Sequence, residues 1–370
     1  MNVLEIVPSW PPSMYLLEHI YSLHASAINL VLGNTNSSDH DITTVNSIRP
    51  SQFFTPVYDL TKFSWQANFR KLDKMRLSNV DKNLSYIIDK HQPDLIHFHS
   101  SHDAIQHHHK AVELSIPYTV SLNSSDIYLE VLEDEAYLPK LYEMLKSTAR
   151  IHISYEGLAS DVEQIPEVSA PITTIRIAYP KSDVIPNSDN MPMHLISAGE
   201  LTWQNGFHDL VRAMIHLPNM SLDIIGTGFD YRHLVFLIHT YNLQDRVQVL
   251  ENITFDSCRD LIGKATAYVH SGIVQEVSEY LLLAMSMGKP VFVTNNVGMD
   301  ELVEDRNNGI YIPIGEVVGM AKQLKTLADV DLMQKIGNAA RTSVEKMFVP
   351  QTHTEKFIQF YQSACHDMAR

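Results

Sequence analysis

Residues 194–217 read HLISAGELTWQNGFHDLVRAMIHL, and the fold of the chain can be predicted from the pattern that they begin. Residues 194–198 are mostly apolar with little polar alternation, which is typical of a strand buried on both faces of a parallel sheet. The segment 199–206 then interrupts the run, and residues 207–217 carry apolar side chains at helical spacing. Another apolar run follows at 222–225. Strand, loop, helix and strand in this order predict a βαβ unit.

The same alternation of short apolar runs and longer amphipathic stretches continues along the chain. The runs that we predict to be strands lie at 3–7, 27–32, 95–99, 118–122, 151–154 and 172–177 in the first half, and at 194–198, 222–225, 247–250, 267–270, 291–294 and 309–312 in the second. Helical patterns lie between them, for example at 231–241 and 279–287. The pattern predicts an α/β protein with two Rossmann-like, doubly wound parallel-sheet domains.

A linker is predicted between the two halves. Residues 181–193 include Pro186 and Pro192 and have no apolar period. We therefore predict an N-terminal domain over residues 1–188 and a C-terminal domain over residues 189–350. The carboxyl ends of both sheets are expected to face a cleft between the domains.

The composition excludes several classes of protein. The 370 residues include 28 Lys and Arg against 43 Asp and Glu, a formal net charge of −15, which argues against a nucleic-acid-binding protein. The two cysteines, Cys258 and Cys365, cannot form a disulfide framework or a multi-thiolate zinc site. Residues 1–7 do not resemble a signal peptide, and no run of about 18 apolar residues could span a membrane. We expect a cytoplasmic protein, at most peripheral to the inner face of a membrane.

The segment 199–207, which follows a strand and begins a helix, resembles the phosphate-binding loop of the group 1 (family 4) retaining glycosyltransferases of GT-B fold. Further segments are similar to motifs of that family and occur in its order, at 225–228, 243–247, 284–291, 298–305 and 308–309. The first half resembles the family more faintly. Its similar segments are Pro11-Pro12, Glu18-His19 and residues 93–99.

This resemblance implies a GT-B-like architecture in which a nucleotide-sugar donor binds the C-terminal domain and the acceptor binds the N-terminal domain. It also implies that a last helix, in residues 351–370, returns to the N-terminal domain. The retaining mechanism of the family needs no protein base, because the leaving phosphate can take the proton of the acceptor. We therefore expect no cofactor and no metal, with the nucleotide sugar as co-substrate.

Two charged positions of the phosphate-binding loop differ from the family. A transferase without a metal must stabilise the negative leaving group with cationic side chains and backbone amides. The resemblance places Glu200 where the family has Arg, and Asn205 where it has Lys. A carboxylate at this position would oppose a bound diphosphate by about 1–4 kcal/mol, depending on the local dielectric. The amides of Gly206 and Phe207 are expected to remain as weak anion ligands.

Two glutamates of the family, one for the donor sugar and one for the ribose, are also replaced. Aligned on residues 284–285, the ribose position is Leu283, which cannot form a hydrogen bond. The sugar position is Gln275, which keeps an acceptor but has no charge. A shift of one residue would bring Glu276 into the sugar site. Otherwise Glu276 and Glu279 are ordinary carboxylates of a loop and of a helix start.

The acceptor side differs from the family as well. Asn123 occupies the position of a histidine, and asparagine cannot act as a base near neutral pH. Asp126 follows it and would also face the acceptor. Tyr15 and Leu16 replace the paired glycines of the acceptor loop, so their side chains would partly block the approach of a sugar.

The candidate site residues form three sets. The candidate catalytic residues are Asn123 and Asp126. The candidate donor-binding residues are Gly199, Glu200, Asn205, Gly206, Gly228, Gln275, Glu276, Ser278, Glu279 and Leu283. The candidate acceptor-loop residues are Tyr15, Leu16 and Glu18.

Two functions remain open from the sequence. The chain is either a divergent hexosyltransferase that assembles a cell-surface polysaccharide, or a catalytically silent homologue that acts as a partner or scaffold of an active enzyme. The replacement of each family side chain considered above indicates that a nucleotide sugar is not used in the usual way. The partners expected are a nucleotide-sugar donor, a glycan or lipid-linked acceptor and, for the silent homologue, a partner glycosyltransferase.

A dense group of histidines has a functional and an ordinary interpretation. His97, His99 and His102 could bind a metal, but the only acidic residue close by in the sequence is Asp103. We therefore predict no metal site here. Residues 107–109 are consecutive on a predicted helix and are expected on its solvated face.

A basic segment also has two interpretations. Residues 69–77 combine apolar residues at helical spacing with basic residues from Arg70 to Arg76. Such a stretch can lie on anionic lipid as a peripheral membrane contact. An ordinary surface helix with a packed apolar face is the preferred interpretation.

Overall fold

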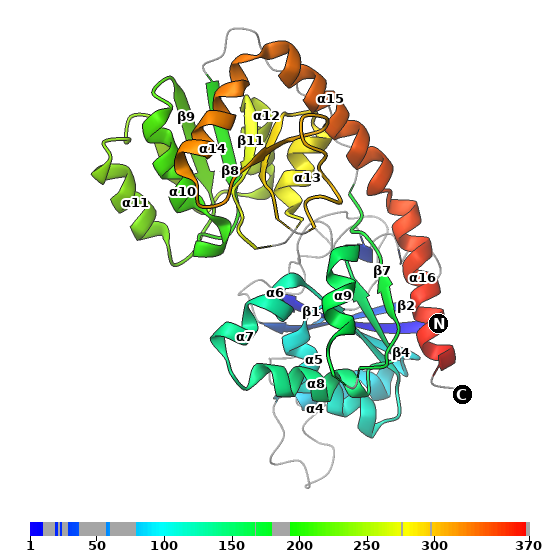
Figure 1. The fold of residues 1–370 in the computed structure, drawn as a ribbon. Coiled ribbons are helices and arrows are strands. Elements are labelled where there is room, and N and C mark those ends of the chain that lie inside the picture. Colours follow the sequence, from blue (N-terminus) through cyan, green and yellow to red (C-terminus); the bar gives the residue numbers. More distant parts are fainter. Residues whose placement is uncertain are drawn as a thin grey trace. The chain divides into compact units, whose positions relative to one another are not determined.

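The computed structural model describes residues 1–9, 19–20, 23, 29–36, 57–59, 79–166, 168–179, 193–274, 277–296 and 298–367. The chain divides into two compact units, and each contains one parallel sheet (Figure 1). The N-terminal unit comprises Met1–Ala178 together with Pro350–Arg370, and the C-terminal unit comprises Tyr179–Val349. No helix of the described residues is long and apolar enough to cross a membrane.

The sheet of the N-terminal unit has seven parallel strands in the order β3-β2-β1-β4-β5-β6-β7. Their bounds are β1 Asn2–Ser9, β2 Asn29–Asn36, β3 Val57–Asp59, β4 Leu95–Phe98, β5 Tyr118–Leu122, β6 Arg150–Ile153 and β7 Ile172–Thr174. The helices are α4 Asn79–His91, α5 Ser101–Glu113, α6 Ser124–Tyr128, α7 Glu130–Glu133, α8 Tyr137–Lys146, the 3₁₀ turn η3 Glu156–Leu158, α9 Ala159–Glu163 and α16 Pro350–Asp367.

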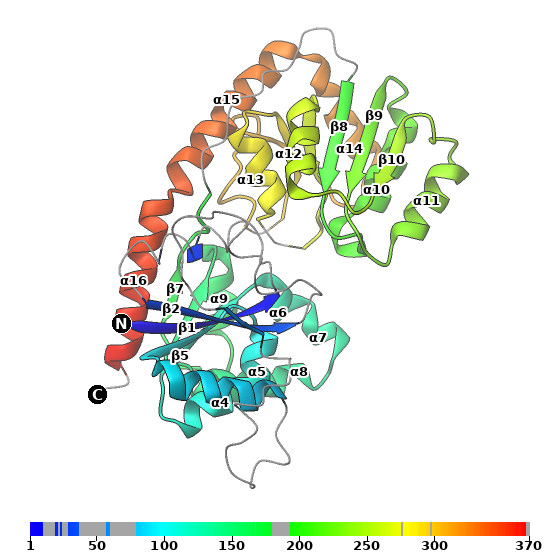
Figure 2. The ribbon, with the colours of Figure 1, turned by 180° about the vertical axis from the view of Figure 1, so that it is seen from behind.

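The helix α16 covers one face of this sheet, although it comes from the far end of the chain (Figure 2). Successive residues of β1 point to opposite faces. Val3 and Val7 pack in one apolar cluster with Phe357 of α16, whereas Leu4 and Ile6 pack in another cluster with α4, α5 and α8. Because Glu5 lies between Val3 and Val7 in this alternation, its carboxylate is on the face that α16 covers.

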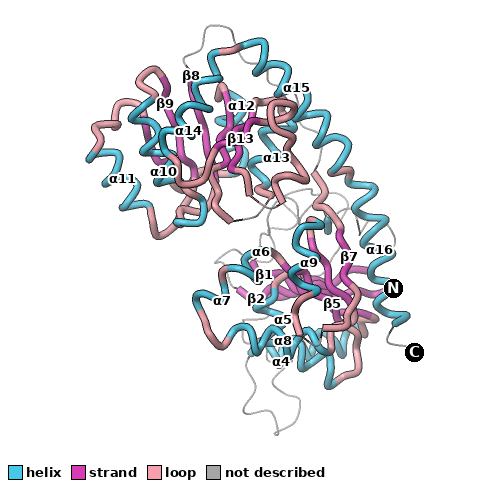
Figure 3. The backbone as a smooth tube through the Cα atoms, in the orientation of Figure 1, coloured by secondary structure: helices cyan, strands magenta, loops and turns pink. Residues whose placement is uncertain are grey.

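The sheet of the C-terminal unit has six parallel strands in the order β10-β9-β8-β11-β12-β13, shown in magenta in Figure 3. Their bounds are β8 Met193–Ala198, β9 Met220–Ile225, β10 Val247–Leu250, β11 Ala267–His270, β12 Val291–Thr294 and β13 Ile310–Ile312. The helices are η4 Trp203–Asn205, α10 Phe207–Ala213, η5 Met214–His216, α11 Tyr231–Thr240, α12 Phe255–Lys264, α13 Glu279–Ser286, α14 Val317–Leu324, η6 Lys325–Ala328 and α15 Val330–Met347.

The predicted fold class is confirmed, because both units are α/β and both sheets are parallel. The helix predicted at 207–217 is shorter than expected: α10 ends at Ala213 and a 3₁₀ turn follows. Of the predicted linker, residues 181–192 lie outside the described part of the chain, and Met193 begins β8. The domain boundary predicted after residue 188 falls among these residues and stays a prediction.

Replacing Phe357 by alanine should destabilise the N-terminal unit by about 3–5 kcal/mol, because the side chain is 2% exposed and its loss leaves a cavity between α16 and the sheet. The exposed neighbour Lys356 is the matched control, and Lys356→Ala should change stability by less than about 0.5 kcal/mol. Urea unfolding combined with amide hydrogen exchange measures both effects. Exchange should accelerate in peptides from β1 and β4 and not in those from β8 and β9; equal acceleration in both units would contradict the placement of α16.

Candidate functional site

The loop between β8 and α10 is held by a close backbone contact. Gly206 directly precedes α10 and has a left-handed backbone, φ 63° and ψ 15°. A Cβ at this residue would lie 2.1 Å from the carbonyl oxygen of Ser271, which follows β11. Only glycine fits this position, because it alone adopts this backbone freely and leaves room for the carbonyl group.

The loop after β9 contacts the same segment. A Cβ on Gly226 would lie 1.8 Å from the carbonyl oxygen of Gly199, and a Cβ on Gly228 would lie 2.4 Å from that of Leu201. The Leu201 N–H donates to the Thr227 carbonyl at 2.8 Å. The two loops are therefore joined through their backbones.

The loop after β11 completes the arrangement. The Ile273 N–H donates to the Gln204 carbonyl at 2.7 Å, and the Ser271 hydroxyl donates to the Asn205 carbonyl at 2.7 Å. We call residues 199–206, 226–228 and 271–273 the glycine-loop patch. It lies at the carboxyl edge of the sheet where the strand order reverses between β8 and β11, which is the usual ligand site of an open α/β sheet.

Glu200 and Asn205, the two residues of the loop after β8 that differ from the family pattern, have different environments. Glu200 is exposed. The Asn205 side-chain amide donates to the Glu200 carbonyl at 2.7 Å, so it closes the loop on itself. The Gly206 amide donates to the Trp203 carbonyl at 3.1 Å, so in this conformation it does not serve an anion as predicted.

The helix α13 carries three of the candidate donor-binding residues. The Ser278 hydroxyl accepts a hydrogen bond from the Tyr280 N–H at 3.3 Å and caps the helix, and Glu279 is its first residue. Leu283 is 2% exposed, so its side chain packs in the interior of the unit. Gln275 and Glu276 lie outside the described residues.

The two candidate catalytic residues form the start of α6. Asn123 is the residue before the helix, and its N–H donates to Asp126 Oδ2 at 2.7 Å. The other oxygen, Oδ1, accepts from the hydroxyl groups of Ser101 and Tyr137. Burial raises the pKa of Asp126. Both carboxylate oxygens therefore have partners within the N-terminal unit, and a role of either residue toward the acceptor stays a prediction.

Several predicted features lie outside the described residues: the acceptor-loop residues Tyr15, Leu16 and Glu18, and the basic segment from Arg70 to Arg76.

The histidines grouped by sequence have different polar partners in the structure, although the rings of His97 and His99 are in contact, with centroids 4.3 Å apart. Both nitrogens of His97 are hydrogen-bonded, to the hydroxyls of Thr119 at 2.8 Å and Ser121 at 3.1 Å. His102 is half exposed and pairs with Glu130 at 3.2 Å. His99 lies instead in a different buried group, described below. The prediction of a solvated face for residues 107–109 is wrong for His107, which is buried.

Two buried titratable residues in the C-terminal unit were not singled out from the sequence. Burial lowers the pKa of His270, at the end of β11, to about 4. Its Nε2 has no hydrogen-bond partner among the described residues. Lys289 is 1% exposed, and burial lowers its pKa to about 8. Nothing in the local sequence signals these shifts, because they come from packing.

A family model described as "Glycosyl transferases group 1" matches residues 180–343. Among curated proteins, the chain is 24% identical over 170 residues to the lipopolysaccharide core biosynthesis glycosyltransferase LpsE of Rhizobium meliloti, covering 46% of this chain and 49% of that protein. It is 26% identical over 184 residues to the putative colanic acid biosynthesis glycosyltransferase WcaL of Escherichia coli, covering 46% and 45%. The chain thus matches about half the length of these relatives.

Solved structures share the fold over the whole chain. The chain superposes on Anabaena Alr3699/HepE in complex with UDP and glucose with a TM-score of 0.81 and 16% identity, covering 98% of this chain and 99% of that one. It superposes on the sucrose-phosphate synthase of Thermosynechococcus elongatus with a TM-score of 0.79 and 15% identity, covering 98% of both chains. At these identities the likeness establishes the GT-B fold.

Gly206→Ala should destabilise the C-terminal unit by more than Gly315→Ala, although both glycines have similar positive φ, 63° and 73°. A Cβ on Gly315 meets nothing within 4 Å, so this control should lose only about 1–2 kcal/mol through its backbone conformation. A Cβ on Gly206 must also displace the Ser271 carbonyl, which adds to the loss. Urea unfolding measures the difference, and equal losses would show that the loop after β11 can move aside.

His270→Gln should make the C-terminal unit less sensitive to acid. The pKa of His270 is about 4 in the folded chain and about 6.5 when unfolded, so its stability contribution is complete above about pH 6.5 and is lost as pH falls toward 4. The loss amounts to at most about 1.4 kcal/mol per pH unit. Urea unfolding at about pH 7.5, 6 and 5 should give a shallower slope in the variant. The exposed control His239→Gln should keep the wild-type slope.

Proposed function

Because residues 180–343 form a domain of the group 1 glycosyltransferase family and the chain has the GT-B fold, we propose that the protein transfers a sugar from a nucleotide-sugar donor to a glycan or glycoconjugate acceptor. The proposed setting is the assembly of a cell-surface polysaccharide. This setting is supported by relatives that are named for lipopolysaccharide core and colanic acid biosynthesis.

The glycine-loop patch is the single observation that carries this proposal. Three loops meet through their backbones at the carboxyl edge of the sheet, at the point where ligands of open α/β sheets bind. Chains of the same fold are known in complex with UDP and with UDP-glucose. The donor would accordingly lie on this patch.

The side chains of the patch offer few favourable contacts to a diphosphate. Its residues include no Lys or Arg, Glu200 adds a negative charge, and the Asn205 amide is hydrogen-bonded within the loop. We therefore expect the wild-type chain to bind nucleotides weakly through the patch. This weakness favours the second candidate function, a catalytically silent homologue that acts as a partner or scaffold of an active glycosyltransferase.

The proposed location is the cytoplasm, with contact to the inner face of the membrane where a lipid-linked acceptor would be presented. The basic residues from Arg70 to Arg76 would supply this contact by attraction to anionic lipid.

A donor screen separates the two functions. The purified chain is incubated with UDP-, GDP- and ADP-sugars, and both thermal stability and release of the nucleotide are followed. A donor at 100 times its dissociation constant should stabilise the chain by about 2.7 kcal/mol. Binding with slow nucleotide release supports the transferase, and stronger release with added glycan acceptor identifies its substrate. The absence of both binding and release would favour the silent homologue.

The double change Glu200→Arg with Asn205→Lys should raise the affinity for UDP or GDP on the order of a hundredfold, because two charge-assisted contacts of about 1.5–3 kcal/mol each become possible. Calorimetric titration measures the affinities. Glu200→Gln is the control for removing the negative charge alone, and Asn205→Ala is the control for losing the amide bond to the Glu200 carbonyl. If the wild type already binds at micromolar strength and the double variant binds no better, Glu200 does not face the phosphates.

A further inference from the structure

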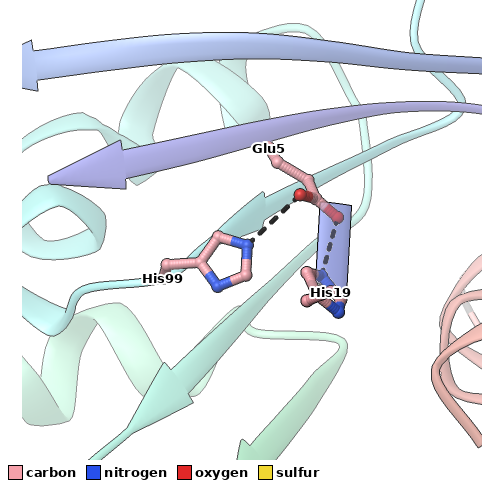
Figure 4. A group of neighbouring side chains, drawn as sticks. All are labelled: Glu5, His19 and His99. Atoms are coloured by element: carbon pink, nitrogen blue, oxygen red, sulfur yellow. Dashed lines mark hydrogen bonds and ion pairs between the residues drawn. The ribbon is translucent and has the colours of Figure 1, made fainter. Parts of the chain in front are cut away.

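A buried polar group lies in the N-terminal unit. It contains Glu5 of β1, His19, and His99 just after β4. Glu5 is 0% exposed, His19 2% and His99 10%. One ligand atom from each residue lies within 4.8 Å of the other two, and Figure 4 shows the two imidazole rings on either side of the carboxylate.

The hydrogen bonds of His353 fix the tautomers in this group. His353 Nδ1 lies 2.7 Å from the Arg176 carbonyl, which can only accept, so Nδ1 carries a proton. In a neutral ring His353 Nε2 then accepts, and its partner at 2.9 Å, His19 Nδ1, is the donor. The Nε2 of a neutral His19 consequently has a lone pair, and it faces Glu5 Oε1 at 3.1 Å. Two acceptors at this distance repel each other unless a cation lies between them.

His99 faces the other oxygen of the carboxylate. Glu5 Oε2 and His99 Nε2 are 3.4 Å apart, and neither makes a hydrogen bond with a described residue. Protons could also fill the two gaps, one on Nε2 of a neutral His99 and one on Nε2 of a cationic His19. One metal ion would satisfy Glu5, His19 and His99 together.

The spacing and the chemistry both suit zinc. Zinc binds imidazole nitrogen and carboxylate oxygen at about 2.0–2.2 Å, so two ligand atoms at tetrahedral angles are about 3.3–3.5 Å apart. The distances from Glu5 Oε1 to His19 Nε2, 3.1 Å, and from Glu5 Oε2 to His99 Nε2, 3.4 Å, are close to this spacing, so the ion would bind both carboxylate oxygens. Two histidines and one carboxylate are also a ligand set that zinc uses in proteins.

The residues around this group hydrogen-bond to the proposed ligands in the way that residues around a metal site do. Ligand histidines usually donate their other N–H to a protein acceptor, and ligand carboxylates are hydrogen-bonded in turn. His19 Nδ1 is bonded to His353 of α16, and Glu5 Oε1 accepts from the Tyr361 hydroxyl of the same helix at 3.0 Å. Both outer partners thus come from α16.

We propose that Glu5, His19 and His99 bind one Zn²⁺ ion that stabilises the N-terminal unit by joining β1, the end of β4 and residue 19 beneath α16. Because the ligands are buried, the ion is structural and takes no part in sugar transfer. The proposal is independent of the proposed function. It replaces the expectation from the sequence that the chain holds no metal.

The test uses the full chain, dialysed against a chelator and then titrated with Zn²⁺ by calorimetry. We expect one tight equivalent and a rise in the midpoint of thermal unfolding that excess chelator reverses. Glu5→Gln and His99→Ala should each weaken binding ~100-fold or more, because each removes a ligand. Tyr361→Phe keeps all three ligands and should weaken binding about 10-fold.

The control is a second group of ligand-type residues, His208, Asp230 and His233. It is more exposed, and its His208 Nε2 and Asp230 Oδ2 atoms are 3.8 Å apart. His233→Ala should leave the tight equivalent unchanged. If it abolishes tight binding while Glu5→Gln does not, the ion belongs to that group and the proposal is wrong.

Two results decide the proposal even where the ligand variants do not fold. The wild type loaded with Co²⁺ should show the intense visible bands of a four- or five-coordinate site with nitrogen and oxygen ligands. If the wild type binds neither Zn²⁺ nor Co²⁺ with a stoichiometry of one, the proposal fails. Glu5 is then paired with a protonated histidine in a buried ion pair.

Discussion

Direct contact between backbones is the constraint on which the glycine-loop patch depends. The carbonyl of Ser271 occupies the space that a side chain at residue 206 would need, and the carbonyl of Gly199 does the same at Gly226. The loops after β8, β9 and β11 can therefore meet only where side chains are absent. Since these contacts involve no charged group, the shape of the patch is compatible with Glu200 and Asn205 in place of cations. Fold and ligand chemistry are specified by different residues of the same loop.

The N-terminal unit depends on a buried carboxylate. Glu5 lies on a central strand with no exposed surface, and a buried charge that loses its partner costs far more than the pair contributes when intact. Tyr361 and His353 connect Glu5 and His19 to α16, so the polar group helps to determine where along the sheet the apolar face of this helix packs. A helix held by apolar contacts alone could shift by a turn at little cost, whereas these hydrogen bonds allow one position.

Most of the fold could be predicted because strands buried on both faces appear as short apolar runs. The predicted strand at 118–122 has the same bounds as β5, and the predicted strand at 222–225 lies within β9. The strand β3, Val57–Asp59, was not predicted, because three residues carry no recognisable period. The helix α10 was predicted to continue to residue 217, beyond its end at Ala213. The 3₁₀ turn that follows has apolar residues at nearly helical spacing, which extends the pattern.

The candidate site was harder to predict, because its residues come from distant parts of the sequence. His97 and His99 are neighbours in sequence and in space, yet the ligand-type partners of His99 are Glu5 and His19. One signal in the sequence was not used: the spacing of Asn123 and Asp126 is that of a capping pair, and in the structure the Asn123 N–H donates to the Asp126 carboxylate.

A residue that differs from a family motif can be interpreted only when its structural role in this chain is known. The resemblance predicts a cation at the position of Asn205, whose amide closes the loop by bonding the Glu200 carbonyl. It predicts a ribose-binding carboxylate at the position of Leu283, whose side chain fills the interior of the unit. Each of these two residues contributes a contact that stabilises the fold. Such substitutions are what selection for stability would retain once nucleotide affinity at these positions is no longer required, and they are equally compatible with a donor held by backbone groups alone.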